Sequence, residues 1–190
     1  MPVRMTRTVI QFPEEVPVLT GEKTVLRPFA KKDAETYFQI RSMPESMKYI
    51  GKAKYRSIEE AYEWMDWIKR EFDQKRSIVW CIADRESDKM LGYGLVFKFN
   101  YSHHWAMVGY ALHKDFFRQG VMSDCLPLII DYAFKEMKLH RLEANIDKRN
   151  IASESLLKKF GFKQEAHFIE NYYFDGQYLD SIHFGLVNPY

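Results

Sequence analysis

The chain has 190 residues, with Lys+Arg 28 against Asp+Glu 26 for a net charge of +2, and aromatic residues make up 16% of it. This length fits one domain, and so many aromatic side chains exclude a disordered chain. The balanced charge excludes the basic surface of a nucleic-acid-binding protein. No apolar stretch approaches the roughly 20 residues of a membrane span.

The N-terminal residues and the two cysteines indicate where in the cell the protein is expected. The segment MPVRMTRTVIQFPEEV contains no apolar run of the kind found in a signal peptide. Cys81 and Cys125 stand far apart in apolar segments. A disulfide and two buried thiols are both open, and thiols in a reducing compartment are the preferred interpretation. No Cys/His spacing indicates zinc. We therefore expect a cytoplasmic protein without a metal.

Strands and helices are expected to alternate along one domain. Residues 1–20 contain three prolines and predict an N-terminal extension, followed by a single domain over residues 21–190. Apolar runs predict strands, and apolar residues at i, i+3, i+4 spacing predict helices. The expected strands are 24–29, 77–83, 90–99, 105–112, 141–146, 162–174 and 178–187. The expected helices are 34–43, 58–72, 123–139 and 151–160. This order predicts an α+β (mixed α/β) domain with one central sheet.

Several boundaries carry local signals. Asp33 is expected to N-cap its helix, and Ser57 with Glu60 forms a capping box. Pro28 places the first strand at an edge or an end. Asp175-Gly176 is typical of a hairpin turn.

The segment His113–Cys125 (HKDFFRQGVMSDC) is the most informative part of the sequence. A strand ends there, a turn centred on Gly120 follows, and a helix begins. Glycine lets the backbone approach a ligand closely. The amides from Arg118 to Ser123 would then be unpaired donors at a helix N-terminus, which is a favourable place for phosphate. A purely structural turn is the alternative.

A set of short motifs follows in order along the chain. They are Gly109-Tyr110, 118–123 (RQGVMS), 132–134 (YAF), 139–144 (LHRLEA), 149–153 (RNIAS), 159–162 (KFGF) and the tail 171–180 (NYYFDGQYLD). In this order and spacing they resemble the GNAT N-acetyltransferases, most closely the RimJ/RimL-type subgroup, over residues 24–187. The resemblance implies a mixed, mostly antiparallel sheet of about seven strands flanked by about four helices. It also implies a splay between the fourth strand (105–112) and the fifth (141–146), where acetyl-CoA binds.

The resemblance further implies roles for individual residues toward acetyl-CoA. Backbone groups of the strand end would pair with the pantetheine arm, the amides of the glycine turn would hold the pyrophosphate, and the N-x-x-S positions would lie beside the pantetheine and the thioester sulfur. These residues are Ala111, Leu112 and His113; Arg118, Gln119, Gly120, Val121, Met122 and Ser123; and Asn150 and Ser153.

Ser153 is the candidate catalytic residue. Transfer to an amine needs a neutral amine, a donor for the developing oxyanion and a proton for the leaving thiolate. A hydroxyl near the sulfur suits the last two tasks. The alternative is a residue of the first helical turn beside Asn150, which is a plausible N-cap.

Several positions depart from the pattern of the family. Phe117 replaces the usual Arg or Gln that opens the phosphate loop, and Met122 replaces a small residue. Met107 stands where many members carry a Glu, and Leu157 where many carry a Tyr. Pro127 implies a late helix start near Ser123 or a kink. An obvious general base and acid are therefore missing.

Other side chains are candidates for the missing base and for a contact with the acceptor. His103, His104 and Glu143 are candidates for the base, and Asp180 for a contact with the amine. The long connection 43–56 between the first two helices is the expected specificity element.

These observations predict an acetyl-CoA-dependent N-acetyltransferase that moves the acetyl group to a primary amine by direct attack in a ternary complex. The acceptor would be a protein N-terminus or a small molecule, and the protein a monomer or homodimer. No nucleic acid or membrane is expected as a partner. The alternatives are a non-catalytic CoA-binding module of the same fold and an unrelated α+β domain with a structural glycine turn.

Overall fold

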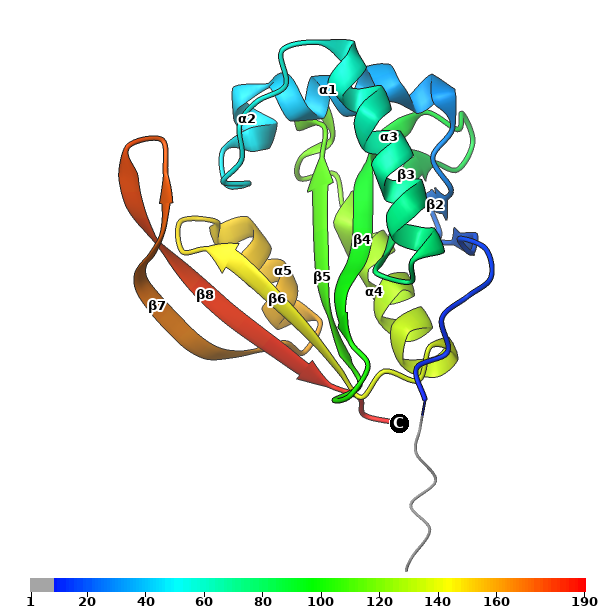
Figure 1. Cartoon of the computed structure of the whole chain (residues 1–190), viewed down its shortest axis with the longest axis vertical. Coiled ribbons are helices and arrows are strands. Elements are labelled where there is room, and N and C mark those ends of the chain that lie inside the picture. Colours follow the sequence, from blue (N-terminus) through cyan, green and yellow to red (C-terminus); the bar gives the residue numbers. More distant parts are fainter. Residues whose placement is uncertain (1–8) are drawn as a thin grey trace, which may run out of the picture.

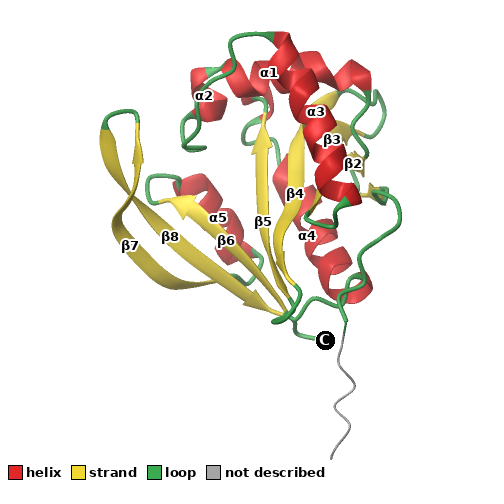
Figure 2. Ribbon diagram, in the orientation of Figure 1, coloured by secondary structure: helices red, strands yellow, loops and turns green. Residues whose placement is uncertain are grey.

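A computed structural model of the protein describes residues 9–190. Its single sheet runs in the order β1-β2-β3-β4-β5-β6-β8-β7, with helices on both faces (Figures 1 and 2). The expected α+β fold class is confirmed. The strands are β1 (Leu19–Thr20), β2 (Thr24–Arg27), β3 (Ser77–Asp84), β4 (Met90–Asn100), β5 (Trp105–Leu112), β6 (Arg141–Asp147), β7 (Lys163–Phe174) and β8 (Gln177–Val187). The helices are α1 (Ala34–Ser42), α2 (Pro44–Met47), α3 (Ile58–Asp73), α4 (Val121–Asp131) and α5 (Ile151–Lys159).

The structure has one strand and one helix more than expected within residues 9–190. Strand β1 pairs with β2 through the register pair Leu19↔Leu26, and helix α2 opens with Pro44 at its first position. Two residues are too few to show strand periodicity, and one helical turn is too short to show helical periodicity. Residues 1–8 of the expected N-terminal extension lie outside the described residues.

The part of the extension that is described packs onto the domain. Ile10 is buried in the main core, and the Gln11 amide donates a hydrogen bond to the Met137 carbonyl at 2.8 Å. The indole N–H of Trp80 donates to the Pro17 carbonyl at 2.8 Å. Tertiary contacts therefore hold this segment, although it contains little regular structure.

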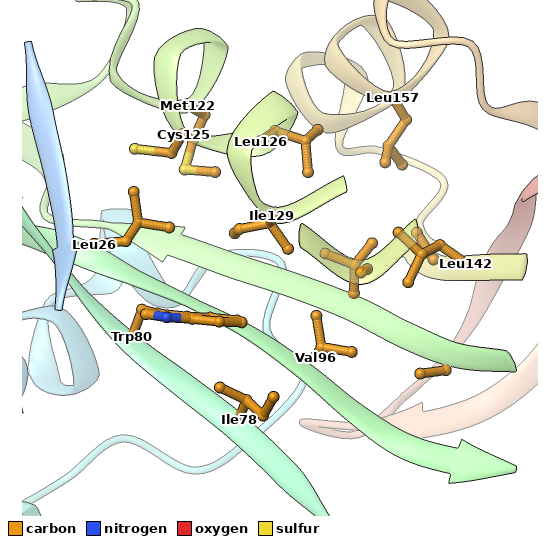
Figure 3. Packing of buried hydrophobic residues seen from close by; sticks show 14 of the residues in the cluster. Leu26, Ile78, Trp80, Val96, Met122, Cys125, Leu126, Ile129, Leu142 and Leu157 are labelled. Carbon is orange, nitrogen blue, oxygen red and sulfur yellow. The ribbon is translucent and has the colours of Figure 1, made fainter. Parts of the chain in front are cut away.

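Alternation along the strands produces two cores, one on each face of the sheet. The larger core lies under α4 and α5 and includes Ile78, Trp80, Leu126 and Leu142 (Figure 3). The smaller core lies under α1 and α3 and includes Tyr37 and Cys81 among others. Cys81 and Cys125 are both buried free thiols, which confirms the expected thiols; the reducing compartment stays a prediction.

Helix α4 differs from its expected bounds at both ends. It begins at Val121, because Gly120 directly before it takes the left-handed conformation with φ +80°. Pro127 lies inside the helix and leaves the Ser123 carbonyl without its i+4 donor. The helix then passes into a π-helical turn over Tyr132–Glu136. The expected helix 123–139 was therefore wrong by two residues at its start and too long at its end.

Asp33 does not cap α1 through its side chain. Its carboxylate instead accepts hydrogen bonds from the Arg27 guanidinium at 2.8 Å and from the Ala30 amide at 2.8 Å. The capping box at α3 is present, with Glu60 Oε1 accepting from the Ser57 amide at 3.3 Å. No helix within residues 9–190 is long and apolar enough to cross a bilayer.

The sheet opens between β5 and β6. These strands are parallel and pair only from Trp105↔Arg141 to Met107↔Glu143. Beyond these pairs the two strands diverge (Figure 1). We call the region between 108–112 of β5 and 144–147 of β6 the split. It corresponds to the splay expected between the fourth and fifth predicted strands.

Candidate functional site

Along the split, one edge of β5 pairs with no strand of residues 9–190. The His113 amide donates to the carbonyl of Leu91 in β4 at 2.8 Å, in register with the pair Tyr93↔Ala111. Because antiparallel strands alternate the direction of their backbone groups, Ala111 also points its N–H and C=O toward β4. Tyr110 and Leu112 then point theirs into the split.

This geometry leaves fewer backbone groups at the end of β5 free for a ligand than the sequence predicts. Both backbone groups of His113 are already used, because its carbonyl also accepts from the Phe116 amide at 3.0 Å. Leu112 is the expected residue whose backbone faces the split, and Tyr110, which was not expected, joins it. The buried His113 ring accepts a hydrogen bond from the Asp115 amide at 3.3 Å. Burial lowers the pKa of His113.

The start of α4 offers backbone amides that are free of acceptors within residues 9–190. Gly120 has φ +80°, and a Cβ added there would meet nothing within 4 Å. The amides from Arg118 to Ser123 donate to no acceptor within residues 9–190, and Asp124 makes the first helical bond, to the Gly120 carbonyl at 3.1 Å. Free amides at the positive end of a helix dipole favour an anion.

Side chains around this helix start fall into two groups. Val121 and Met122 are buried in the core, so they present only their amides to a ligand. Gln119 donates to the Asp115 carbonyl at 2.6 Å and thereby braces the loop. Lys159 of α5 reaches the Ser123 hydroxyl at 3.4 Å. It brings a cation to the helix start that sequence reasoning did not assign to the site.

Ser153 joins α5 to β5 across the split. Its hydroxyl lies 2.7 Å from the Tyr110 hydroxyl, and Ser153 is 7% exposed. Burial raises the pKa of Tyr110 to about 12, although the hydrogen bond with Ser153 acts in the opposite direction. The phenol is therefore protonated at neutral pH and keeps a proton to donate.

Asn150 is the N-cap of α5. Its side-chain oxygen accepts from the Ser153 amide at 3.2 Å, which is the structural alternative considered for this pair. The cap positions the first turn of α5, and with it the Ser153 hydroxyl. Leu157 is fully buried in the core one turn later.

The candidates for a general base are either paired or remote. Glu143 accepts from Arg141 at 2.8 Å. His103 and His104 precede β5, at the end where β5 and β6 pair rather than at the split. Within residues 9–190 there is no group of three or more His, Cys, Asp or Glu side chains suited to a metal ion.

Asp180 is fully engaged in the β7–β8 hairpin. It accepts hydrogen bonds from the Glu170 amide at 2.9 Å, from His167 at 2.7 Å and from Lys148 at 3.1 Å. These contacts hold the pKa of Asp180 at about 2. The expected contact with an acceptor amine would require this network to open.

Comparison with known families decides the identity. Residues 23–163 match the model of the acetyltransferase (GNAT) domain. The chain belongs to the GNAT family. The match covers most of the chain, including the split, the glycine turn and α5, and this GNAT protein is an N-acetyltransferase.

Named relatives agree with this assignment. The GNAT chain is 28% identical to the uncharacterized N-acetyltransferase YoaA of Bacillus subtilis, across 91% of this chain and 98% of that protein. It is 23% identical to the spermidine N(1)-acetyltransferase of Escherichia coli K12, across 83% and 82% of the two chains.

Solved structures share the fold. A GNAT acetyltransferase from Bacillus anthracis matches with a TM-score of 0.80 at 21% identity, covering 92% of this chain and 100% of that one. RimJ of Mycobacterium smegmatis, in complex with CoA-disulfide, matches with a TM-score of 0.80 at 17% identity, covering 90% and 88%. At these identities the likeness concerns the fold alone.

Proposed function

We propose that this GNAT enzyme transfers an acetyl group from acetyl-CoA to a primary amine, by direct attack of the amine on the thioester in a ternary complex. The observation that carries the proposal is the juxtaposition of an unpaired strand edge with a helix start that offers free amides. A strand edge suits the amide groups of a pantetheine arm, and a helix start suits a pyrophosphate.

The residues present fit this co-substrate. The free amides of 118–123 and the open space at Gly120 would hold the phosphates, with Lys159 and Arg118 as nearby cations. The backbone of Tyr110 and Leu112 would pair with the pantetheine arm. Acetyl-CoA supplies the activated acyl group and a thiolate leaving group.

Ser153 and Tyr110 would supply the proton to that leaving group. Ser153 provides the hydroxyl near the sulfur, and Tyr110, protonated and 2.7 Å away, would fix its rotamer and resupply the proton. A thiolate leaves readily because the parent thiol has a pKa near 8.5, so this contribution to the rate is moderate. Glu143 is neutralised by Arg141, so we assign deprotonation of the amine to water rather than to a residue.

The subgroup proposed is the RimJ/RimL type. The support is the order of motifs from Gly109 to Phe162 together with the fold shared with RimJ. The acceptor is then a protein N-terminus or a small amine. The cytoplasmic location and the monomeric or dimeric state stay predictions.

Calorimetric titration of acetyl-CoA into the whole chain tests the co-substrate site. Gly120→Glu puts an anionic side chain where the phosphates would lie. Gly176→Glu is a matched control, because Gly176 has φ +78° and its Cβ position is equally open. We expect micromolar binding by the wild type and the control, and no binding by Gly120→Glu. A wild type that fails to bind would overturn the proposal.

Release of free CoA in the presence of an amine tests turnover. The enzyme should release CoA only when an acceptor is present. Binding of acetyl-CoA without release, over a broad panel of amines and peptides, would favour the non-catalytic module instead.

A further inference from the structure

A cluster of tyrosines encloses a buried guanidinium at the end of α1. Arg41 is 6% exposed, and its guanidinium carbon lies 4.5 Å from the centre of the Tyr55 ring. Tyr37 contacts Tyr55 and Tyr93 edge-on, with ring centres 5.9 and 5.4 Å apart. We call Arg41, Tyr37, Tyr55 and Tyr93 the Arg41 cluster.

Two polar groups of the Arg41 cluster lack partners. Arg41 Nε and the Tyr37 hydroxyl are buried without a hydrogen bond to any of residues 9–190. Within residues 9–190, Arg41 Nη2 makes one long hydrogen bond, 3.4 Å, to the Ala53 carbonyl, and the guanidinium also interacts with the Tyr93 hydroxyl. Arg41 Nε can only donate and the Tyr37 hydroxyl can donate, so one acceptor group would satisfy both.

No carboxylate neutralises Arg41 within residues 9–190. Other arginines do form ion pairs with Asp or Glu, namely Arg27, Arg76, Arg141 and Arg149. The eight residues that are not described contain no Asp or Glu. The contact with Tyr55 offsets part of the cost of burying the charge, but a buried cation without an anion remains unfavourable.

Further positive charge adjoins the cluster. The pKa of Lys52 is lowered by desolvation and then by the charges of Arg41 and Lys98. Neither lysine forms an ion pair within the described part of the chain, and Lys98 lies against the Phe97 ring. Arg41, Lys52 and Lys98 therefore repel one another, and none of the three forms an ion pair within residues 9–190.

This region borders the split on the face opposite α4 and α5. Tyr93 of β4 is paired with Ala111 of β5, directly beside the open strand edge. The connection that follows α1 crosses over the split, because a Cβ at Gly51 would lie 3.4 Å from the Tyr172 ring of β7. Figure 1 shows α2 between the end of β5 and the β7–β8 hairpin.

Three acids on the far side of the split already form ion pairs. Glu143 pairs with Arg141, Asp147 with Arg149 at 2.6 Å, and Asp180 with Lys148. Asp147 also accepts from the Tyr172 hydroxyl at 2.8 Å. A polycation would find these carboxylates occupied and three cations opposing it, whereas an anion would find free donors.

Building on the proposed function, we infer that the acceptor amine carries a carboxylate, which the guanidinium of Arg41 binds. The planar fork of arginine suits a carboxylate through two parallel hydrogen bonds, and the Tyr37 hydroxyl adds a third donor. The amine would then extend toward the split. A free amino acid and a peptide N-terminus followed by an acidic residue share this chemistry.

Rates of CoA release from matched acceptors test the inference. One arm compares glycine and β-alanine with their amides, and another compares the peptides Ala-Glu-Ala-amide and Ala-Gln-Ala-amide. Spermidine serves as the polycation. We expect the acid to exceed its neutral analogue by about tenfold or more in kcat/KM in one arm, since the analogue leaves the donors unpaired. That arm identifies the source of the carboxylate.

Arg41→Gln should abolish the preference for the acid and leave kcat/KM for the neutral acceptor unchanged. Arg41→Lys should retain part of the preference for the acid. Arg70→Gln is the matched control, because Arg70 lies on α3 with an exposed side chain and its loss removes the same charge. Unchanged binding of acetyl-CoA by the Arg41 variants verifies that they fold.

A binding arm separates this inference from the proposed function. Glutarate is titrated into the wild type and into Arg41→Gln in the presence of CoA. If no amine is acetylated but glutarate binds only when Arg41 is present, the assignment of Arg41 as a carboxylate site stands while the proposed function fails. Any of three results would overturn the inference. These are equal rates for the acid and its neutral analogue in both arms, a preference for spermidine, and equal binding of glutarate by the wild type and Arg41→Gln.

Discussion

The hydroxyls of Tyr110 and Ser153 lie 2.7 Å apart and link β5 to α5 across the split. The two residues are 43 positions apart in the chain, and both lie where the paired part of the sheet has ended. Tyr110 also points its backbone groups into the split. One residue of β5 thus offers both its main chain and its side chain to the proposed thioester.

A double-mutant cycle tests this pair. We expect Ser153→Ala and Tyr110→Phe each to lower kcat by about 10- to 100-fold while leaving acetyl-CoA binding unchanged. If the hydroxyls act as a unit, the double variant should lose little more than either single one. If the loss in kcat of the double variant equals the product of the two single losses, the hydroxyls do not act as a unit. Unchanged kcat in both single variants would show that neither hydroxyl takes part in the reaction.

Leu157 occupies the position where many family members carry a tyrosine, yet here it is fully buried. Introducing the ring by Leu157→Tyr should overpack the core and lower the free energy of unfolding by about 1–3 kcal/mol. We expect no gain in kcat. Chemical denaturation and CoA release measure the two effects, and a more active, equally stable variant would show that this position faces the reaction after all.

The Asp124 side chain of α4 binds the turn between β1 and β2 through hydrogen bonds. It accepts from the amides of Glu22, Lys23 and Thr24 and from the Thr24 hydroxyl at 2.7 Å. Removing the carboxylate by Asp124→Ala should lower the free energy of unfolding by about 2–4 kcal/mol, since several donors lose a charged acceptor.

Asp131→Ala on the same helix is the control for Asp124. Asp131 makes only exposed contacts within residues 9–190, an ion pair with Lys135 at 2.9 Å and a hydrogen bond from the Tyr190 hydroxyl at 3.3 Å, so its loss should cost less than about 1 kcal/mol. Equal costs for the two variants, measured by urea denaturation, would mean that the Asp124 network adds no stability.

The pH dependence of Asp124 follows from its shifted pKa. Burial alone would raise it, but the hydrogen bonds from Thr24, Lys23 and Glu22 outweigh burial and lower it. A depressed carboxyl pKa stabilises the fold above the ordinary value and loses that contribution as the pH falls through the folded value. The difference in stability between wild type and Asp124→Asn should therefore shrink on acidification below about pH 4.

Asp180 should titrate abnormally in the folded protein. The Glu170 amide, His167 and Lys148 lower its pKa from 3.8 to about 2. Its contribution to the hairpin is therefore complete above the ordinary pKa and is lost as the pH falls toward 2. Carbon NMR of the carboxyl should give a midpoint near 2 that rises in His167→Gln; a midpoint at the ordinary value would refute the network.

Local chemistry in the sequence was enough to predict most of the fold. Apolar periodicity placed the long strands and helices within a few residues, except for the end of α4, because burying one face imposes that period. The Gly120 turn was also predictable, since a left-handed position before a helix favours glycine. The errors concern β1 and α2, which are too short to show a period. They also concern α4, where tertiary packing rather than helix propensity allows Pro127 inside the helix and produces the π-helical turn.

The features of the candidate site also fall into those that the sequence predicts and those that it does not. The sequence by itself determined the helix start with its free amides, because those groups are consecutive in the chain. Only the tertiary structure decided which side chains meet across the sheet: Tyr110 with Ser153, Lys159 with Ser123, and Arg41 with its tyrosines. These contacts join residues many positions apart, and their existence depends on strand parity, on the register of β4 with β5, and on where β5 and β6 cease to pair. No local pattern carries that information, since it arises only when the sheet has formed.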